Sequence, residues 1–87
     1  SLDVVTVSVV YSMRADGIKF SVRSEIKEVD AGKMIACALD GVGNGGGHIG
    51  MAGGFIQKDN ISELGEDIDD NIRTRFMRQV MMQREAE

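Results

Sequence analysis

The sequence has little of the chemistry that small proteins use for covalent or metal-based support. It contains one cysteine, Cys37, which cannot form an internal disulfide, and one histidine, His48, which leaves no ligand cluster for a structural zinc. We therefore expect Cys37 to be a small, buried, apolar residue. No apolar run approaches the roughly 20 residues of a membrane helix. Residues 2–10 also lack the basic region that opens a signal peptide, so we predict a cytoplasmic location and no membrane partner.

An excess of positive charge is also missing, and the formal net charge is −4. This balance argues against a nonspecific clamp on duplex DNA, which normally needs a strongly basic surface. The charges are nevertheless segregated along the chain. The basic residues of the first half are Arg14, Lys19, Arg23, Lys27 and Lys33, and the acidic residues of the later segment are Glu63, Glu66, Asp67, Asp69 and Asp70. A locally basic region is therefore expected.

Aromatic residues make up 5% of the chain, and they form no ladder on which a long single strand could stack its bases. We expect all four in the hydrophobic core: Tyr11, Phe20, Phe55 and Phe76.

The first third of the chain predicts a β-hairpin in a single small domain, since 87 residues leave room for one core. Residues 3–11 are rich in β-branched types, and their nearly continuous apolar character indicates a strand that is central in its sheet or buried on both faces. Asp16-Gly17 supplies a tight turn. Residues 18–25 then alternate apolar and polar side chains, as in a strand with one packed face.

Two helices are predicted further along. Asp30 is a candidate N-cap for residues 31–39, whose apolar stripe ends before Gly41 as a C′ residue. A longer helix is expected from Asn60, with Glu63 as the partner in a capping box, to about residue 83. Three methionines near its end, Met77, Met81 and Met82, fit either core filling or a partner-binding surface. The predicted class is α+β (mixed α/β), a small mixed β-sheet built on the N-terminal hairpin with two helices packed on it.

The stretch GVGNGGGHIGMAGGF, residues 41–55, holds eight of the eleven glycines. It lies between a predicted helix and a short predicted strand, residues 54–58, so an open binding loop fits it better than a flexible linker. Three consecutive glycines can turn backbone N–H groups toward one anion, and the next residue, His48, adds a side-chain donor. The alternative is that His48 caps local backbone groups. The loop lacks the lysine and serine of a P-loop.

The order IKFSVRSE, DAGKMIACALDGVG and GGGHIGMAGGFI resembles the DHH-associated domain, the C-terminal substrate-binding module of DHH-family phosphoesterases. The resemblance covers residues 11–56, and GGGH followed by an alanine-glycine-glycine run is its most specific part. It implies that residues 1–87 form a single substrate-binding domain of a larger phosphoesterase. The family includes RecJ-type exonucleases, oligoribonucleases and cyclic dinucleotide phosphodiesterases.

The resemblance also implies which residues bind substrate. The phosphate-binding set would be Arg23, Ser24, Gly45, Gly46, Gly47 and His48, supported by Ala52 and Gly53. Met51 stands where the family more often has alanine. No catalytic or metal-binding residue is implied in this chain, which has no Asp-His-His triplet. Manganese or magnesium would belong to a separate N-terminal catalytic domain, and this chain alone would not be an enzyme.

The implied function is to hold a short single-stranded oligonucleotide, a nucleotide or a cyclic dinucleotide for hydrolysis by the DHH catalytic domain in cis. An alternative of another class is a structural module that docks a partner or forms a homodimer through its methionine-rich last helix. The glycine-rich C-terminal domain of alanyl-tRNA synthetases is a weaker alternative, because it does not normally carry histidine after its glycines.

Overall fold

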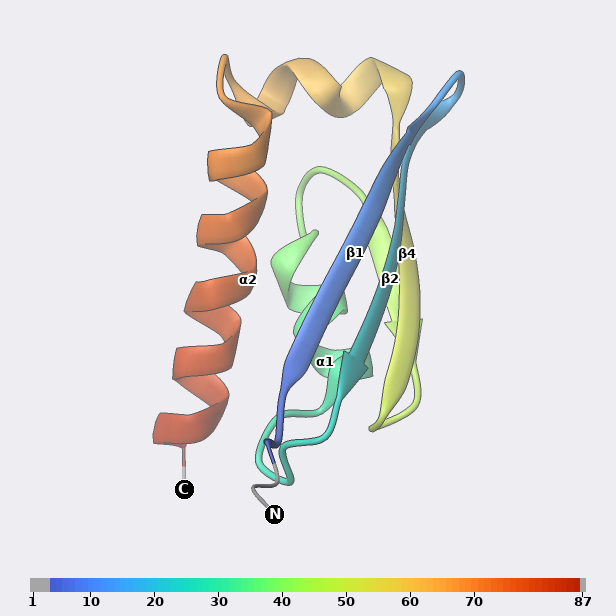
Figure 1. Cartoon of the computed structure of the whole chain (residues 1–87). Helices are drawn as coiled ribbons and strands as arrows, with labels where there is room; N and C mark the ends of the chain where they lie inside the picture. Colours follow the sequence, from blue (N-terminus) through green and yellow to red (C-terminus); the bar gives the residue numbers. More distant parts are fainter. Residues whose placement is uncertain (1–3, 87) are drawn as a thin grey trace.

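The computed structural model describes residues 4–86. Its four strands form one antiparallel sheet in the order β1-β2-β4-β3, and both α-helices lie on one side of it (Figure 1). The α+β class is confirmed, although the sheet is antiparallel throughout rather than mixed. The elements are β1 (Val7–Arg14), β2 (Gly17–Ser24), α1 (Ala31–Ala38), β3 (Asn44–Gly47), β4 (Met51–Gln57), the 3₁₀ helix η1 (Lys58–Leu64) and α2 (Ile68–Glu85).

The predicted N-terminal hairpin is present, but the position of its first strand was wrong. β1 is an edge strand, and the side chain of Val10 is 65% exposed. An apolar run does not show whether both faces are covered, and here the helices cover only one face. The predicted start at Asp3 lies outside the described residues. The turn consists of residues 15–16, and Gly17 is the first residue of β2. Residue 17 must be glycine because a Cβ there would lie 2.1 Å from the carbonyl oxygen of Ile56.

The core lies between the sheet and the two helices, as the alternation in β2 predicts. Ile18, Phe20 and Val22 are at most 1% exposed. The ring of Phe20 has its centroid 5.8 Å from that of Phe76 on α2, in a tilted arrangement that favours aromatic packing. Phe55 was wrongly predicted to lie in the core. It is half-buried and is not part of the core cluster, because its strand position points away from the helices.

Helix α1 begins as predicted, with the Asp30 carboxylate accepting a hydrogen bond from the Lys33 amide at 3.0 Å. Gly41 has φ of +87°, but it follows the C-cap Leu39 by two residues rather than one. The prediction for Cys37 was wrong, because its thiol-bearing side chain is exposed. The buried stripe of α1 takes in residues 31, 34, 35 and 38, and position 37 falls on the opposite side of the helix.

The long C-terminal helix is interrupted, contrary to the prediction. η1 ends at Gly65, which has φ of +80°, and α2 starts afresh with Asp67 as N-cap, accepting from the Asp70 amide at 3.0 Å. The repeat of apolar residues every four positions continues across this break, which is why the pattern alone concealed it. Asn60 does not form the predicted capping box, because its side-chain amide donates to the Val42 carbonyl at 3.1 Å.

Helices α1 and α2 run antiparallel and are joined at both ends. Near the end of α1, Arg75 donates to the Ala38 carbonyl at 3.1 Å, and Asn71 orients its guanidinium by accepting from Nε at 2.7 Å. A cation there satisfies carbonyls that the helix leaves without partners. At the start of α1, the Gln83 side chain accepts from the Asp30 amide at 2.8 Å. Neither helix within residues 4–86 is long and apolar enough to cross a membrane.

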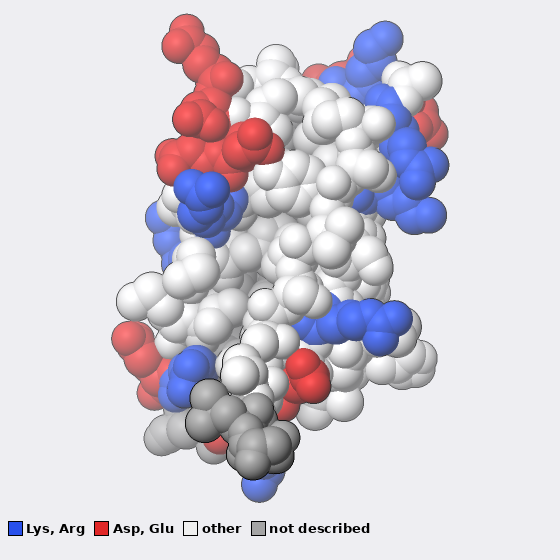
Figure 2. All heavy atoms as spheres, viewed as in Figure 1, with Lys and Arg blue, Asp and Glu red and all other residues white. Residues whose placement is uncertain are grey.

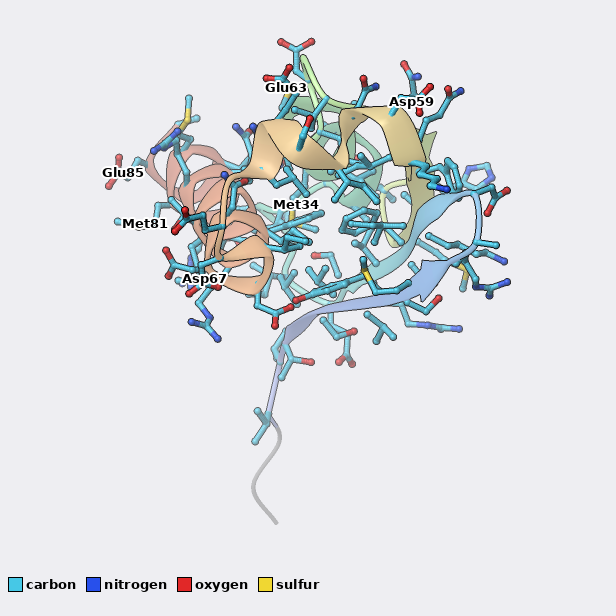
Figure 3. All side chains as sticks on the ribbon, turned by 90° about the horizontal axis from the view of Figure 1, so that it is seen from above. Met34, Asp59, Glu63, Asp67, Met81 and Glu85 are labelled. Atoms are coloured by element: carbon cyan, nitrogen blue, oxygen red, sulfur yellow. The ribbon has the colours of Figure 1, made fainter. Side chains whose placement is uncertain are left out.

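The three C-terminal methionines are exposed and do not fill the core. Met77, Met81 and Met82 are 53–56% exposed. In Figure 3, Met34 of α1 lies in the interior between the helices and the sheet, whereas Met81 lies on the side of α2 that faces away from the sheet. The open choice between core filling and a contact surface is therefore decided in favour of an exposed surface.

Candidate functional site

The glycine-rich stretch forms a β-hairpin, so the expectation of a binding loop was wrong. The strand predicted over residues 54–58 is present, but it begins earlier, as β4 (Met51–Gln57). β3 pairs with β4 from Asn44 opposite Phe55 to Gly47 opposite Ala52. The His48 amide then donates to the Met51 carbonyl at 2.8 Å and closes a turn over residues 49–50. Glycine has a low strand propensity, so composition alone does not indicate this pairing.

Close packing of α1 explains why parts of this hairpin must be glycine. A Cβ on Gly45 would lie 2.8 Å from Cγ1 of Ile35, and one on Gly54 would lie 2.7 Å from Cδ1 of the same side chain. A glycine is also needed on the helix side of this contact, because a Cβ on Gly32 of α1 would lie 2.7 Å from the Gly47 carbonyl oxygen. Gly46 is different, since its Cβ would meet nothing within 4 Å. Packing against α1 therefore accounts for Gly45 and Gly54, whereas a Cβ on Gly47 would lie 2.7 Å from Ala52 of β4. Neither reason applies to Gly46.

The three GGG amides do not converge on one spot, as a loop would have allowed. In an antiparallel ladder, successive residues direct their N–H groups alternately toward and away from the neighbouring strand. Because His48 is hydrogen-bonded to Met51, this alternation directs the Gly46 amide toward β4 and those of Gly45 and Gly47 away from it. Any anion bound here would therefore meet these amides singly rather than as a group.

The first turn of α1 also has no amide to spare for an anion, because protein oxygens already accept from it. The Ala31 amide donates to the Ile49 carbonyl at 2.7 Å, and the Gly32 amide donates to the His48 carbonyl at 3.0 Å. The third amide is capped by Asp30. These bonds fasten the hairpin turn to the helix, so the backbone of His48 is held in a fixed position.

The predicted site residues divide between the two faces of the sheet. We call the face that the helices leave uncovered the outer face. Its exposed residues include Arg23 on β2, Gly46 on β3, His48 beside the turn, and Met51 and Gly53 on β4. Four other predicted residues do not face it: Ser24, Gly45, Gly47 and Ala52. The structure therefore brings part of the predicted set together on one surface.

Across the outer face, Arg23 and His48 lie on either side of Met51. Arg23 is directly opposite Met51 in the β2–β4 register, and Met51 is hydrogen-bonded to His48. With about 4.8 Å between neighbouring strands, the Cα atoms of the two flanking residues are about 10 Å apart. Met51 itself is 49% exposed. A donor or cation thus stands at each side of a flexible apolar side chain, on an open surface.

Ser24 has a local structural role next to this row. Its hydroxyl donates to the Ile26 carbonyl at 3.1 Å and accepts from the Ile26 amide at 3.2 Å. Its own amide donates to the Gly50 carbonyl at 3.0 Å, which ties the end of β2 to the hairpin turn. A hollow of about 200 Å³ opens beside this junction, lined by Ser24, Glu25, Ile26, Lys27, Ile49 and Gly50.

The site prediction did not include several other residues of the outer face, among them three on β2 and β4. Lys19, Ser21 and Phe55 follow the same alternation, and Lys19 lies directly opposite Phe55. Extending the period-two pattern of residues 18–25 across the sheet would have found Lys19 and Ser21, but the unrecognised hairpin concealed Phe55. Figure 2 shows basic side chains along the sheet side of the molecule and acidic ones gathered where α2 begins.

The chain matches the family model of the DHHA1 domain over residues 2–74. The chain belongs to the DHHA1 domain family. This is the DHH-associated domain of DHH-family phosphoesterases, as the GGGH resemblance implied. No curated protein and no solved structure matches the chain. The match takes in the whole sheet, α1 and the start of α2, and the three exposed methionines of α2 in this DHHA1 domain, Met77, Met81 and Met82, lie beyond it.

Proposed function

We propose that this DHHA1 domain binds the phosphate of a short single-stranded oligonucleotide, a nucleotide or a cyclic dinucleotide on the outer face of its sheet. The observation that carries the proposal is the row formed by Arg23, Met51 and His48, which no described element covers. A guanidinium binds phosphate through charge-assisted, often bidentate hydrogen bonds. An imidazole can donate to a second oxygen near neutral pH.

The remaining surface suits a small ligand with a base or sugar attached to its phosphate. Gly46 and Gly53 are paired across β3 and β4 and carry no side chains, so a ring or the backbone of a ligand can approach the sheet closely there. Phe55 and the neighbouring Lys19 lie further along the same face. A single half-buried aromatic ring supports a short ligand better than a long strand, which would need a series of stacking rings.

In the proposal, hydrolysis is carried out by a DHH catalytic domain of the same protein. Among residues 4–86, no three His, Cys, Asp or Glu side chains come together in a way that could hold a metal ion. We therefore assign manganese or magnesium to the catalytic domain and route no chemical step through this chain. This chain would contribute by positioning the substrate. A phosphate held at a fixed point beside the catalytic domain reacts in an effectively intramolecular step rather than after a bimolecular encounter. We place this work in the cytoplasm, where an exposed free thiol such as Cys37 stays reduced.

Binding of a 5′-phosphorylated dinucleotide, measured by calorimetric titration, tests the proposal. His48→Ala and Arg23→Ala should each weaken binding roughly tenfold or more, since each removes a hydrogen bond to a charged group. Arg84→Ala makes the same change of charge in the last turn of α2 and should leave the affinity unchanged. Equal affinity in the parent chain, His48→Ala and Arg23→Ala would refute the proposal.

The exposed methionines favour a second candidate function, docking of a partner or of a second copy through α2. Met77, Met81 and Met82 line an apolar hollow of about 480 Å³ on the side of the helix away from the sheet. Sedimentation of the chain and of a triple variant of these methionines tests it. An association lost in the variant, in a chain that binds no nucleotide, would favour docking over phosphate binding.

A further inference from the structure

The two edges of the sheet differ in how they are protected. The β3 edge spans only four residues, and the start of α1 lies against the end of its hairpin, where the Gly32 amide donates to the His48 carbonyl. The β1 edge spans eight residues and pairs on one side only, with β2. Proteins usually guard such an edge with lysine, proline or a bulge, because its free backbone groups can pair with another strand.

β1 carries none of these guards over residues 7–13. The segment VSVVYSM contains no charged residue and no proline, and its register with β2 is continuous from Val7 to Arg14. Two large apolar side chains on it are well exposed, Val10 at 65% and Met13 at 58%. Residues 7–13 therefore form an uncharged edge segment without a bulge and with exposed apolar side chains.

The free amides of β1 can be identified from the ladder. The Glu25 amide donates to the Thr6 carbonyl, so Thr6 and Glu25 form a hydrogen-bonded pair, and alternate residues of β1 then bond to β2 in the same way. The amides and carbonyls of the intervening residues point away from the sheet. These residues are Val7, Val9, Tyr11 and Met13, and no backbone or side-chain bond among residues 4–86 uses their amides.

The segment is also self-complementary about Val10. Reading outward from Val10 in both directions gives Val9 and Tyr11, then Ser8 and Ser12, then Val7 and Met13. In an antiparallel pair with a second β1, Val9 would face Tyr11 of the other copy and Ser8 would face Ser12. Aromatic with β-branched pairs and serine with serine pairs are favourable across antiparallel strands.

The same register joins the free backbone groups. Pairing centred on Val10 places Val9 opposite Tyr11 and Val7 opposite Met13, so that every outward-facing amide meets an outward-facing carbonyl, in about eight hydrogen bonds. Val10 would pack against Val10 of the second copy as a non-hydrogen-bonded pair, in which side chains approach most closely. The first charged residue beyond the segment, Arg14, would face Thr6, so no like charges oppose each other.

We propose that a second copy of this chain binds the β1 edge in antiparallel register centred on Val10. The two four-stranded sheets then form one continuous sheet, with both outer faces on the same side. The pairing uses the β1 margin of the outer face through Val10, but neither the row of Arg23, Met51 and His48 nor the exposed methionines of α2, so it stands apart from the proposed phosphate binding. A different strand from elsewhere in a longer protein would compete for the same edge, and the test distinguishes it.

The test is sedimentation equilibrium of the chain over a range of concentrations, with two matched variants. Val10→Lys places like charges opposite each other at the centre of the pair and should raise the dimer dissociation constant roughly tenfold or more. Met81→Lys makes the same kind of change at a side chain of similar exposure, 55%, on α2 and should leave dimerisation unchanged. Both positions are exposed, so both variants should fold.

Amide hydrogen exchange provides the second measurement. At low concentration the amides of Val9 and Tyr11 should exchange fast and those of Ser8 and Val10 slowly, and at high concentration all four should be protected. A chain that is monomeric even at millimolar concentration would overturn the proposal and leave the edge to another strand. A dimer lost in Met81→Lys but kept in Val10→Lys, or one in which Val9 and Tyr11 still exchange fast, would also overturn it.

Discussion

The two glycines Gly45 and Gly46 are neighbours in sequence, but the structure predicts opposite responses to the same substitution. A Cβ on Gly45 would lie 2.8 Å from Cγ1 and 3.0 Å from Cγ2 of Ile35, where ordinary carbon contacts are about 3.5–4.0 Å. Ile35 is fully buried, so its side chain cannot swing into solvent. Gly45→Ala therefore forces α1 and β3 apart by a few tenths of an ångström or more.

The magnitude follows from two opposing effects. Overpacking of a well-filled core costs about 1–3 kcal/mol, and replacing glycine by alanine returns about 0.4–1 kcal/mol by restricting the unfolded chain. We expect Gly45→Ala to lower the free energy of unfolding by a net amount of about 1–2 kcal/mol. Each kcal/mol lowers Tm by about 4–8 °C in a domain of this size. Gly46→Ala meets no atom within 4 Å and should be neutral or slightly stabilising.

Thermal and urea unfolding of the two variants beside the parent chain measure this difference. The expected order of Tm is Gly46→Ala at or above the parent chain, and Gly45→Ala clearly below it. If both variants unfold together, or if Gly46→Ala is the less stable, the hairpin does not pack against α1 as described.

Two further predictions concern the contacts of α2. Arg75→Ala should lower the free energy of unfolding by about 1.5–3 kcal/mol, because it removes a charged donor from the last carbonyls of α1. The exposed Arg78→Ala should change it by less than about 0.5 kcal/mol in the same urea titration, and equal losses would contradict the capping role. The pKa of Tyr11 is raised above 10.0, chiefly because its hydroxyl donates to the Asp69 carboxylate. A raised pKa means that this contribution is complete below about pH 10 and is lost as pH rises through the folded-state pKa. The stability difference between the parent chain and Tyr11→Phe should therefore shrink above pH 10, and a constant difference would contradict the bond.

Local patterns in the sequence were enough to predict the hairpin, the start of α1 and the class of the fold. The alternation from Ile18 to Val22 identified the core face of β2, and Asp30 identified the cap of α1. These features depend on residues close together in the chain. Period and capping chemistry therefore indicate them without knowledge of the tertiary contacts.

The errors arose where contacts between distant segments decide the structure. The glycine stretch is a hairpin because α1 packs against it and β2 pairs with β4, neither of which can be inferred from the composition of the stretch. The edge position of β1 depends on the strand order of the whole sheet. The break at Gly65 was concealed because the apolar repeat runs across it.

Half of the predicted site residues share one surface, and their binding of phosphate stays a prediction. Arg23, Gly46 and His48 do reach one exposed surface, whereas Gly45 and Ala52 turn to the helix side of the sheet. The GGGH motif identifies the segment that contains the candidate site. Within a strand, successive side chains point to opposite faces, so only half of the residues of that segment reach the outer face. Recognising the strand is what separates residues that can touch a ligand from those that let α1 approach.

The most direct test of the phosphate-binding face is an NMR titration of the isotope-labelled chain with a 5′-phosphorylated dinucleotide. We expect the largest amide shifts on the outer face, at Arg23, Gly46, His48, Met51 and Gly53. In His48→Ala these shifts should need a roughly tenfold or higher ligand concentration, while the rest of the spectrum keeps its dispersion. Shifts confined to α2, or the same outer-face shifts in His48→Ala at an unchanged ligand concentration, would contradict the proposal.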